Sequence, residues 1–194
     1  MSAQAPKRST APVAVVSGGS SGIGRAFVTA LAKQGYVVHA CGRDLDRLEQ
    51  LRVALPDVQT AVCDVTDRTS LRDFAARVAA DHGRLDLLVS NAGGSRELDL
   101  ATMDRVLDLT SEMRVNYEGA VNLIAEFLPL LKSGAPSRLI IVGSGYGLVP
   151  SPRVPLYSAS KAALHSLAQS LRLALAPLGV SVTEVCPPVV DTPS

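Results

Sequence analysis

The chain alternates short apolar runs with longer segments of helical periodicity, and this alternation limits its fold more than any other feature. The apolar runs, each a predicted strand, are residues 14–16, 36–41, 58–63, 85–90, 138–143 and 181–186. The predicted helices are residues 21–34, 44–55, 67–82, 102–131 and 156–176. Strict alternation with short connections is typical of parallel sheets, and near-continuous apolar strands indicate a sheet covered on both faces. The sequence therefore predicts a three-layer α/β fold, a doubly wound sheet of about six parallel strands in the order 3-2-1-4-5-6.

Length and charge exclude several other classes of protein. The chain has 194 residues, 47% of them hydrophobic, and 19 basic residues face 18 acidic ones. Such a composition excludes disorder for most of the chain and argues against electrostatic binding of nucleic acid. No run of about 18 apolar residues occurs, so we expect no membrane span. We expect residues 1–11 to be a flexible leader, since they lack the apolar core of a signal peptide, and residues 12–194 to form one domain.

The cysteines and histidines are few and widely spaced. No CxxC pair occurs among the three cysteines, which argues against a disulfide framework or a zinc site and favours a reducing, cytoplasmic compartment. The three histidines share no metal-ligand spacing, so the sequence predicts no metal site. These residues are Cys41, Cys63, Cys186, His39, His82 and His165.

A glycine-rich segment follows the first predicted strand and opens the first predicted helix. Residues 17–24 read SGGSSGIG. At this point of a β-α-β unit, helix N–H groups bind the pyrophosphate of a dinucleotide, and glycines let the backbone approach it closely. The strand before and the helix after favour this interpretation over an ordinary turn. The predicted dinucleotide-binding residues here are Gly18, Ser20, Ser21, Gly22, Ile23 and Gly24.

The end of the second predicted strand bears on the choice of dinucleotide. A carboxylate there binds the ribose 2′-hydroxyl of NAD and repels a 2′-phosphate. This chain has Gly42 and Arg43 instead, and the adjacent Asp44 is better placed to cap the next helix. The guanidinium of Arg43 suits a 2′-phosphate, so we expect NADPH to be preferred over NADH, although Arg43 could also be a solvated loop residue.

Tyr157 and Lys161 lie four positions apart at the start of the last predicted helix. This spacing places both side chains on one face, one turn apart. A free tyrosine has a pKa of about 10. A nearby ammonium stabilises the phenolate, so we expect Lys161 to lower the pKa of Tyr157 and prepare it for acid-base catalysis. The pair alone is also compatible with an ordinary amphipathic helix.

Taken together, these motifs resemble the short-chain dehydrogenase/reductase family over residues 11–194. The glycine spacing G-x-x-x-G-x-G is that of the family's TGxxxGxG loop, with Ser17 in place of threonine. Residues 90–93, SNAG, resemble its NNAG motif, and Ser90 departs from the first asparagine. The resemblance implies a Rossmann-like fold and further dinucleotide contacts at Asp64, Val65, Asn91, Ala92, Gly93, Tyr157, Lys161, Pro187, Val189 and Thr192.

The same resemblance implies a catalytic set of four residues, Asn116, Ser144, Tyr157 and Lys161. Ser144 stands thirteen positions before Tyr157, as the family's catalytic serine does, and could polarise a substrate carbonyl. The family's asparagine holds a water that links the lysine to bulk solvent. The expected substrate wall is residues 94–97, 145–149 and 189 onward, where Tyr146 and Leu148 are the bulkiest candidates.

The last residues, PPVVDT at 187–192, resemble the DltE-like branch of this family. Judged against the family's usual length of about 250 residues, the chain is C-terminally short by roughly 50. We therefore expect the substrate-lid segment and the usual seventh strand to be absent. A pocket without that segment would be completed by a partner subunit or left open.

These observations predict an oxidoreductase that interconverts a small-molecule ketone and a secondary alcohol by hydride transfer from NADPH. Two alternatives remain open, a dinucleotide-binding module with reduced or no catalysis and an NAD(P)-dependent alcohol dehydrogenase or epimerase. The family usually dimerises through two long helices, which implies a homodimer through residues 114–132 and 156–176.

Overall fold

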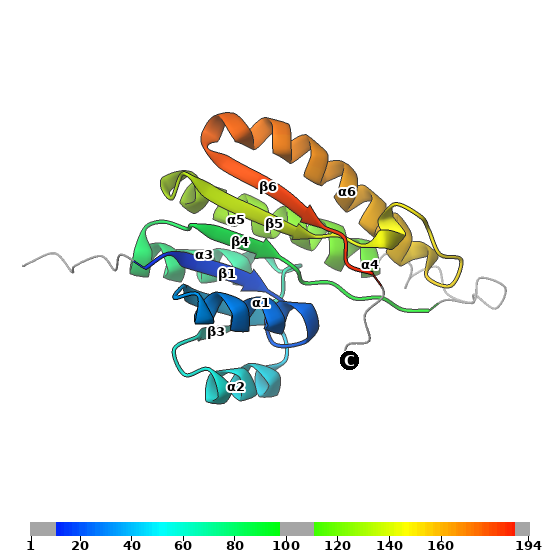
Figure 1. The fold of residues 1–194 in the computed structure, drawn as a ribbon. Helices are drawn as coiled ribbons and strands as arrows, with labels where there is room; N and C mark the ends of the chain where they lie inside the picture. The colour runs from blue at the N-terminus through cyan, green and yellow to red at the C-terminus, as the bar shows by residue number, and fades with distance from the viewer. Residues whose placement is uncertain (1–10, 98–110, 189–194) are drawn as a thin grey trace, which may run out of the picture.

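The computed structural model describes residues 11–97 and 111–188 and contains one six-stranded sheet (Figure 1). All neighbouring strands pair in parallel, and their order is β3-β2-β1-β4-β5-β6. This order confirms the predicted topology. The strands are β1 (Val13–Ser17), β2 (Val37–Gly42), β3 (Gln59–Val62), β4 (Leu87–Ser90), β5 (Ser137–Val142) and β6 (Val180–Val185).

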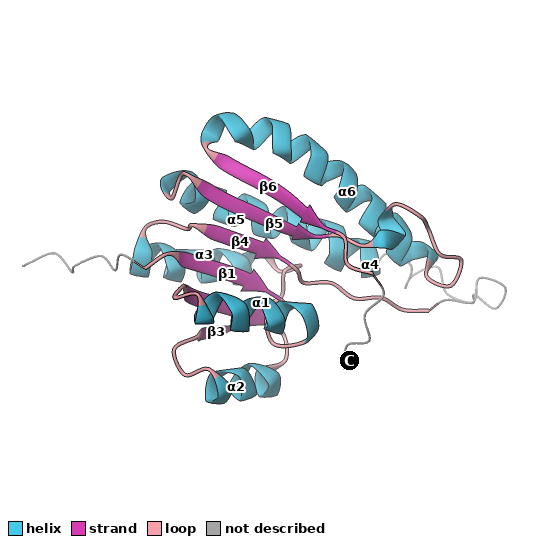
Figure 2. Cartoon of the chain, in the orientation of Figure 1, coloured by secondary structure: helices cyan, strands magenta, loops and turns pink. Residues whose placement is uncertain are grey.

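Helices cover both faces of this sheet, and each face has its own apolar core (Figure 2). One core contains residues of α3, α5 and α6, and the other contains residues of α1 and α2. Successive residues of β1 alternate between the two cores, as the twofold periodicity of a strand requires. The helices are α1 (Gly22–Lys33), α2 (Leu45–Ala54), α3 (Arg68–His82), α4 (Ser111–Met113), α5 (Gly119–Ser133) and α6 (Pro155–Leu175).

Side-chain caps fix the starts of two helices where the sequence places them. Asp44 accepts a hydrogen bond from the backbone N–H of Arg47 at 3.0 Å, so its carboxylate caps α2 as predicted. Asp67 accepts one from the N–H of Thr69 at 2.9 Å and caps α3. The other predicted boundaries lie within a few residues of the observed ones.

The main departure from the predicted secondary structure lies between residues 111 and 133. The sequence predicts a helical pattern over 102–131, and the structure interrupts it with a π-helical segment, Arg114–Glu118, between α4 and α5. A π turn is one residue wider than an α turn, and such turns are frequent at functional sites. Residues 98–110, which contain the start of the predicted helix, lie outside the described part of the chain, as do residues 1–10 of the predicted leader.

Within the described ranges, no helix combines the length and the apolar character that crossing a bilayer requires.

Candidate active site

The carboxyl ends of β1 and β4 are joined by Ser17 and Asn91. The Ser17 hydroxyl accepts hydrogen bonds from the backbone N–H groups of Asn91 and Ala92, both at 3.0 Å. The Asn91 side chain in turn donates to the carbonyls of Ser17 and Gly18, at 3.0 and 3.2 Å. This network positions the glycine-rich loop against the segment that follows β4. Both segments were predicted to bind the dinucleotide.

The glycine-rich loop has no room for side chains at two of its glycines. Gly18 has a φ of +62°, and a Cβ there would lie 2.9 Å from the Asn91 amide nitrogen. A Cβ at Gly24 would overlap the backbone of Gly18, so the first turn of α1 packs directly on the loop. Ser21, at the N-cap of α1, makes no side-chain capping bond, which leaves first-turn N–H groups available to an anion.

Two adjoining hollows open over the carboxyl edge of the sheet, with volumes of about 620 and 590 Å³. The shared lining residues are Gly18, Ser21, Gly22, Ala92, Gly93, Gly94 and Ser95. The first hollow adds Ile23, Asn91, Ser144, Tyr157, Lys161 and Pro187, and the second adds Ser20, Arg43, Asp64 and Val65. The structure therefore gathers almost all the predicted residues. Gly24 lies beneath the loop, the buried Asn116 lines neither hollow, and Val189 and Thr192 lie outside the described residues.

The second hollow carries two arginines, of which sequence reasoning identified one. Arg43 follows β2 and Arg47 lies in the first turn of α2, and both line this hollow. The carboxylate of Asp44 lies 3.2 Å from the Nε of Arg47 and is occupied by this ion pair and by the cap of α2. The basic residue three positions after the predicted helix cap was the signal that could have identified Arg47.

Helix α6 presents Tyr157 and Lys161 to the first hollow. The Nζ of Lys161 donates a hydrogen bond to the Val142 carbonyl at 2.8 Å and lies 5.6 Å from the centre of the Tyr157 ring. Lys161 is 4% exposed, and this burial lowers its pKa to about 8. A lysine with that pKa still carries its charge at neutral pH.

The pKa of Tyr157 departs from the sequence-based prediction. We expected the neighbouring ammonium to lower it, but burial of the phenol raises it above its usual value. A hydrogen bond with Ser144 opposes this shift, whereas the nearby Glu112 and Tyr146 reinforce it. For the protein without a bound dinucleotide the prediction was wrong. It considered the positive charge of Lys161 and omitted the loss of hydration around the phenol. Tyr157 is therefore a neutral phenol at pH 7.

Ser144 lies at the end of β5 and caps a single 3₁₀ turn, Gly145–Gly147. Its Oγ accepts a hydrogen bond from the N–H of Tyr146 at 3.2 Å, which holds the hydroxyl beside the hollow. The Tyr146 ring stands edge-on to that of Tyr157, with 6.5 Å between ring centres. Of the two bulky wall candidates, Tyr146 lines the hollow, whereas Leu148 does not and is 55% exposed.

Asn116 lies in the π-helical segment and is 1% exposed. Its Oδ1 accepts from the N–H of Gly94 at 2.8 Å, and its Nδ2 donates to the Gly94 carbonyl and to the Ser160 hydroxyl, both at 2.9 Å. The Ser160 hydroxyl donates onward to the Tyr157 carbonyl at 2.8 Å. Asn116 thus connects the segment after β4 to the first turn of α6, and both hydrogens of its amide are used in doing so.

A buried carboxylate near Lys161 was missed at the sequence level. The side chain of Glu184 on β6 is 7% exposed, and its Oε2 lies 2.6 Å from Nδ1 of His165. Its other oxygen, Oε1, is buried without a hydrogen-bond partner. The charge of Glu184 raises the pKa of Lys161 and so opposes the effect of burial. An acidic residue inside a predicted strand, 181–186, was the signal that could have identified it.

Comparisons with known proteins agree with this geometry. A family model described as short chain dehydrogenase matches residues 12–194. The chain belongs to the short-chain dehydrogenase family. The oxidoreductase DltE of Bacillus subtilis is 36% identical to this short-chain dehydrogenase over 180 residues, which span 92% of this chain and 71% of DltE. The predicted resemblance, including its DltE-like character, is confirmed.

Solved structures of other short-chain dehydrogenases contain the same fold with a nicotinamide dinucleotide. RhlG of Pseudomonas aeruginosa, in complex with NADP, superposes with a TM-score of 0.86 at 31% identity, over 95% of this chain and 75% of RhlG. An NADPH-bound short-chain oxidoreductase of P. aeruginosa PAO1, described as having an atypical catalytic centre, gives a TM-score of 0.83 at 34% identity over 90% of this chain and 70% of that one. This short-chain dehydrogenase is accordingly an NAD(P)-dependent oxidoreductase.

The position of Glu184 leads to a prediction for Lys161. Replacing Glu184 by Gln removes a negative charge and should lower the pKa of Lys161 below about 8, because burial is then less opposed. The chain has four lysines, Lys7, Lys33, Lys132 and Lys161, so lysine-selective NMR can follow the titration of each. The matched control is Glu126→Gln on α5, which should leave the titration of Lys161 unchanged. An unaltered Lys161 pKa in Glu184→Gln contradicts the assignment.

Proposed function

We propose that this short-chain dehydrogenase is an NADPH-dependent carbonyl reductase that converts a small-molecule ketone into a secondary alcohol. The observation that supports this most directly is the arrangement of Ser144, Tyr157 and Lys161 around one hollow, which adjoins the glycine-rich cradle. Hydroxyl, phenol and ammonium groups meet there at the carboxyl edge of the sheet, where open α/β folds bind ligands.

The cradle has the features that a dinucleotide requires. Gly18 and Gly24 admit no side chain, and the first-turn N–H groups of α1 are free of a side-chain cap. The residues that would hold the dinucleotide are Gly18, Ser20, Ser21, Gly22, Ile23, Arg43, Asp64, Val65, Asn91, Ala92, Gly93, Tyr157, Lys161 and Pro187. When bound, NADPH supplies the hydride that reduces the carbonyl carbon.

In the proposed mechanism, Ser144 and Tyr157 act on the substrate oxygen. The Ser144 hydroxyl donates a hydrogen bond to it and polarises the carbonyl. The phenol of Tyr157 then donates the proton that turns this oxygen into a hydroxyl. Burial raises the pKa of Tyr157, so the phenol carries at neutral pH the proton that reduction requires. The alcohol dehydrogenase or epimerase alternative would need Tyr157 to start as the phenolate.

The proposed role of Lys161 is to hold a positive charge beside Tyr157 and to bind the ribose hydroxyls of the dinucleotide. Its Nζ uses one donor on the Val142 carbonyl, which leaves two N–H donors for other partners. Asn116 fixes the start of α6 through Ser160, and we propose that this contact sets the position of Tyr157. The family's additional role for this asparagine, holding a water, remains a prediction.

The preference for NADPH over NADH is proposed on electrostatic grounds. No carboxylate follows β2 in the position that would repel a 2′-phosphate, since Gly42 stands there and Asp44 is paired with Arg47. Arg43 and Arg47 both line the hollow at this point. The NADP and NADPH complexes of the two P. aeruginosa neighbours agree with this preference.

The mechanism predicts that Tyr157→Phe binds NADPH normally but loses turnover by about 10²- to 10⁴-fold, because the proton donor is absent. Turnover on a panel of ketones and NADPH binding by fluorescence would be measured in parallel. Tyr36→Phe, away from both hollows, is the matched control and should keep full activity. Full turnover in Tyr157→Phe would exclude the proposed proton donor. A wild type that binds NADPH and reduces no carbonyl would favour the binding-module alternative.

The electrostatic argument predicts that Arg43→Ala weakens NADPH binding about 10- to 100-fold, because one hydrogen bond to a charged group typically contributes that much affinity. NADH has no 2′-phosphate, so its binding should be unchanged. Calorimetric titration with each dinucleotide measures the ratio. Arg52→Ala is the matched control, because Arg52 lies on α2, outside both hollows, and its guanidinium is paired with Glu49. It should alter neither affinity. Equal losses for NADPH and NADH in Arg43→Ala would refute the assignment of Arg43 to the 2′-phosphate.

We also propose a homodimer through α5 and α6. Each helix keeps an exposed apolar residue, Val121 at 37% and Leu173 at 79%, although α5 turns most of its apolar side chains toward the sheet. Light scattering after size exclusion should give twice the mass of the chain, and Val121→Glu with Leu173→Glu should shift it to the monomer. A wild-type monomer at all concentrations would contradict the proposal.

A further inference from the structure

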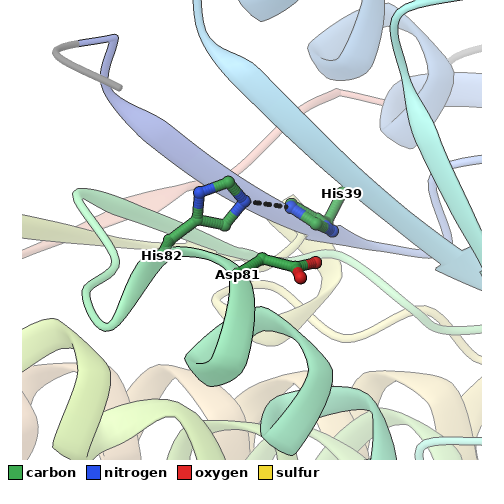
Figure 3. Close-up of side chains that lie close together, drawn as sticks. All are labelled: His39, Asp81 and His82. Atoms are coloured by element: carbon green, nitrogen blue, oxygen red, sulfur yellow. Dashed lines mark hydrogen bonds between the residues drawn. The ribbon is translucent and has the colours of Figure 1, made fainter. Parts of the chain in front are cut away.

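His39 and His82 meet in space although 43 positions separate them (Figure 3). His39 lies in β2 and His82 is the last residue of α3, and their Nε2 atoms are 2.9 Å apart. The carboxylate of Asp81 is close by, so that one ligand atom from each of the three residues lies within 4.8 Å of the others. None of these residues lines either hollow of the proposed active site.

The two histidines differ in how firmly they are held. His39 is 5% exposed, and its strand is paired on both sides, with Val15 of β1 and Gln59 of β3 opposite it. His82 is half-buried at a helix end, and Asp81 is exposed. The buried imidazole of His39 therefore faces Asp81 and His82 at the end of α3. Helix ends move more easily than central strands, and solvent reaches this one.

The distance between the two nitrogens is close to that of a metal-bound pair. Two Zn–N bonds of about 2.0–2.1 Å at a tetrahedral angle separate their nitrogens by about 3.3 Å. To admit an ion, the two nitrogens must therefore separate by only a few tenths of an ångström, while both imidazole rings turn their lone pairs toward it.

Local charges favour a cation at this point, with one exception. The C-terminus of α3 carries the negative end of the helix dipole, and Asp81 adds a carboxylate. Arg77, one turn earlier on α3, places a positive charge near His39 and so disfavours a cation at this point. The guanidinium of Arg77 lies over the Phe74 ring, 5.9 Å from its centre.

We propose that His39, Asp81 and His82 bind a divalent transition-metal ion of the Zn²⁺ type, with water as the remaining ligand. Imidazole nitrogens and a carboxylate are the donors that this ion takes in proteins. The bound ion would tie the end of α3 to the middle of β2. The sequence predicts no metal site because the ligand spacing is long range, and only the fold brings the three residues together.

Calorimetric titration of the tag-free protein with Zn²⁺ tests the proposal, with thermal unfolding followed in parallel. We expect one ion per chain and a higher melting temperature with Zn²⁺, because the site exists only in the folded protein. His82→Ala should reduce the affinity by more than about 100-fold, beyond the 10- to 100-fold that loss of an outer-shell partner costs. Asp81→Asn should reduce it less, since the amide oxygen can still coordinate.

His165→Ala is the matched control, because it removes the third histidine of the chain, and it should bind Zn²⁺ as the wild type does. Asp81 is exposed and His82 is half-buried at a helix end, so their variants test the site even if the buried His39 tolerates no substitution. Absence of Zn²⁺ binding in the wild type at millimolar concentration overturns the proposal and leaves the pair as a simple hydrogen bond. Binding that persists in His82→Ala also overturns it.

Discussion

The junction between β1 and β4 is the contact on which the rest of the molecule depends. The strand order reverses at this point, so the helices that follow the two strands leave toward opposite faces and open a crevice at the carboxyl edge. Four hydrogen bonds close the junction, since the Ser17 hydroxyl accepts two from backbone N–H groups and the Asn91 side-chain amide donates two to backbone carbonyls. A threonine hydroxyl could serve as well as that of Ser17, which explains why the chain departs from the family's usual residue without losing the geometry.

A second brace holds the catalytic half of the crevice to the first half. Hydrogen bonds run from the backbone of Gly94 through Asn116 to Ser160, and from there to the backbone of Tyr157. Asn116 and Ser160, the side chains of this route, are buried, and an unmade hydrogen bond is costly there. The nucleotide side and the proton-donor side of the crevice are therefore set relative to one another by side chains that need not touch substrate.

Local sequence signals predicted most of the fold and most of the residues around the crevice. Strand order followed from alternation, and Asp44 was recognised as a helix cap from its position before an amphipathic segment. The features that escaped prediction depend on long-range burial. The raised pKa of Tyr157, the Glu184–His165 pair and the His39–His82 contact each arise where distant segments exclude water together. The residue periodicity of a single segment carries no information about its contacts with distant segments.

The π-helical segment before α5 has a consequence for how this region can vary. Its wider turn accommodates one residue more than an α-helix of the same rise would. Deleting any one residue of 114–118 would let the segment relax to a regular helix without rotating the turns on either side, because the wider turn takes up the additional residue. Only the residues of the segment itself would change direction. The amide of Asn116 would then turn away from Gly94. The contact between Asn116 and Gly94 therefore depends on the number of residues in this segment as well as on the identity of residue 116.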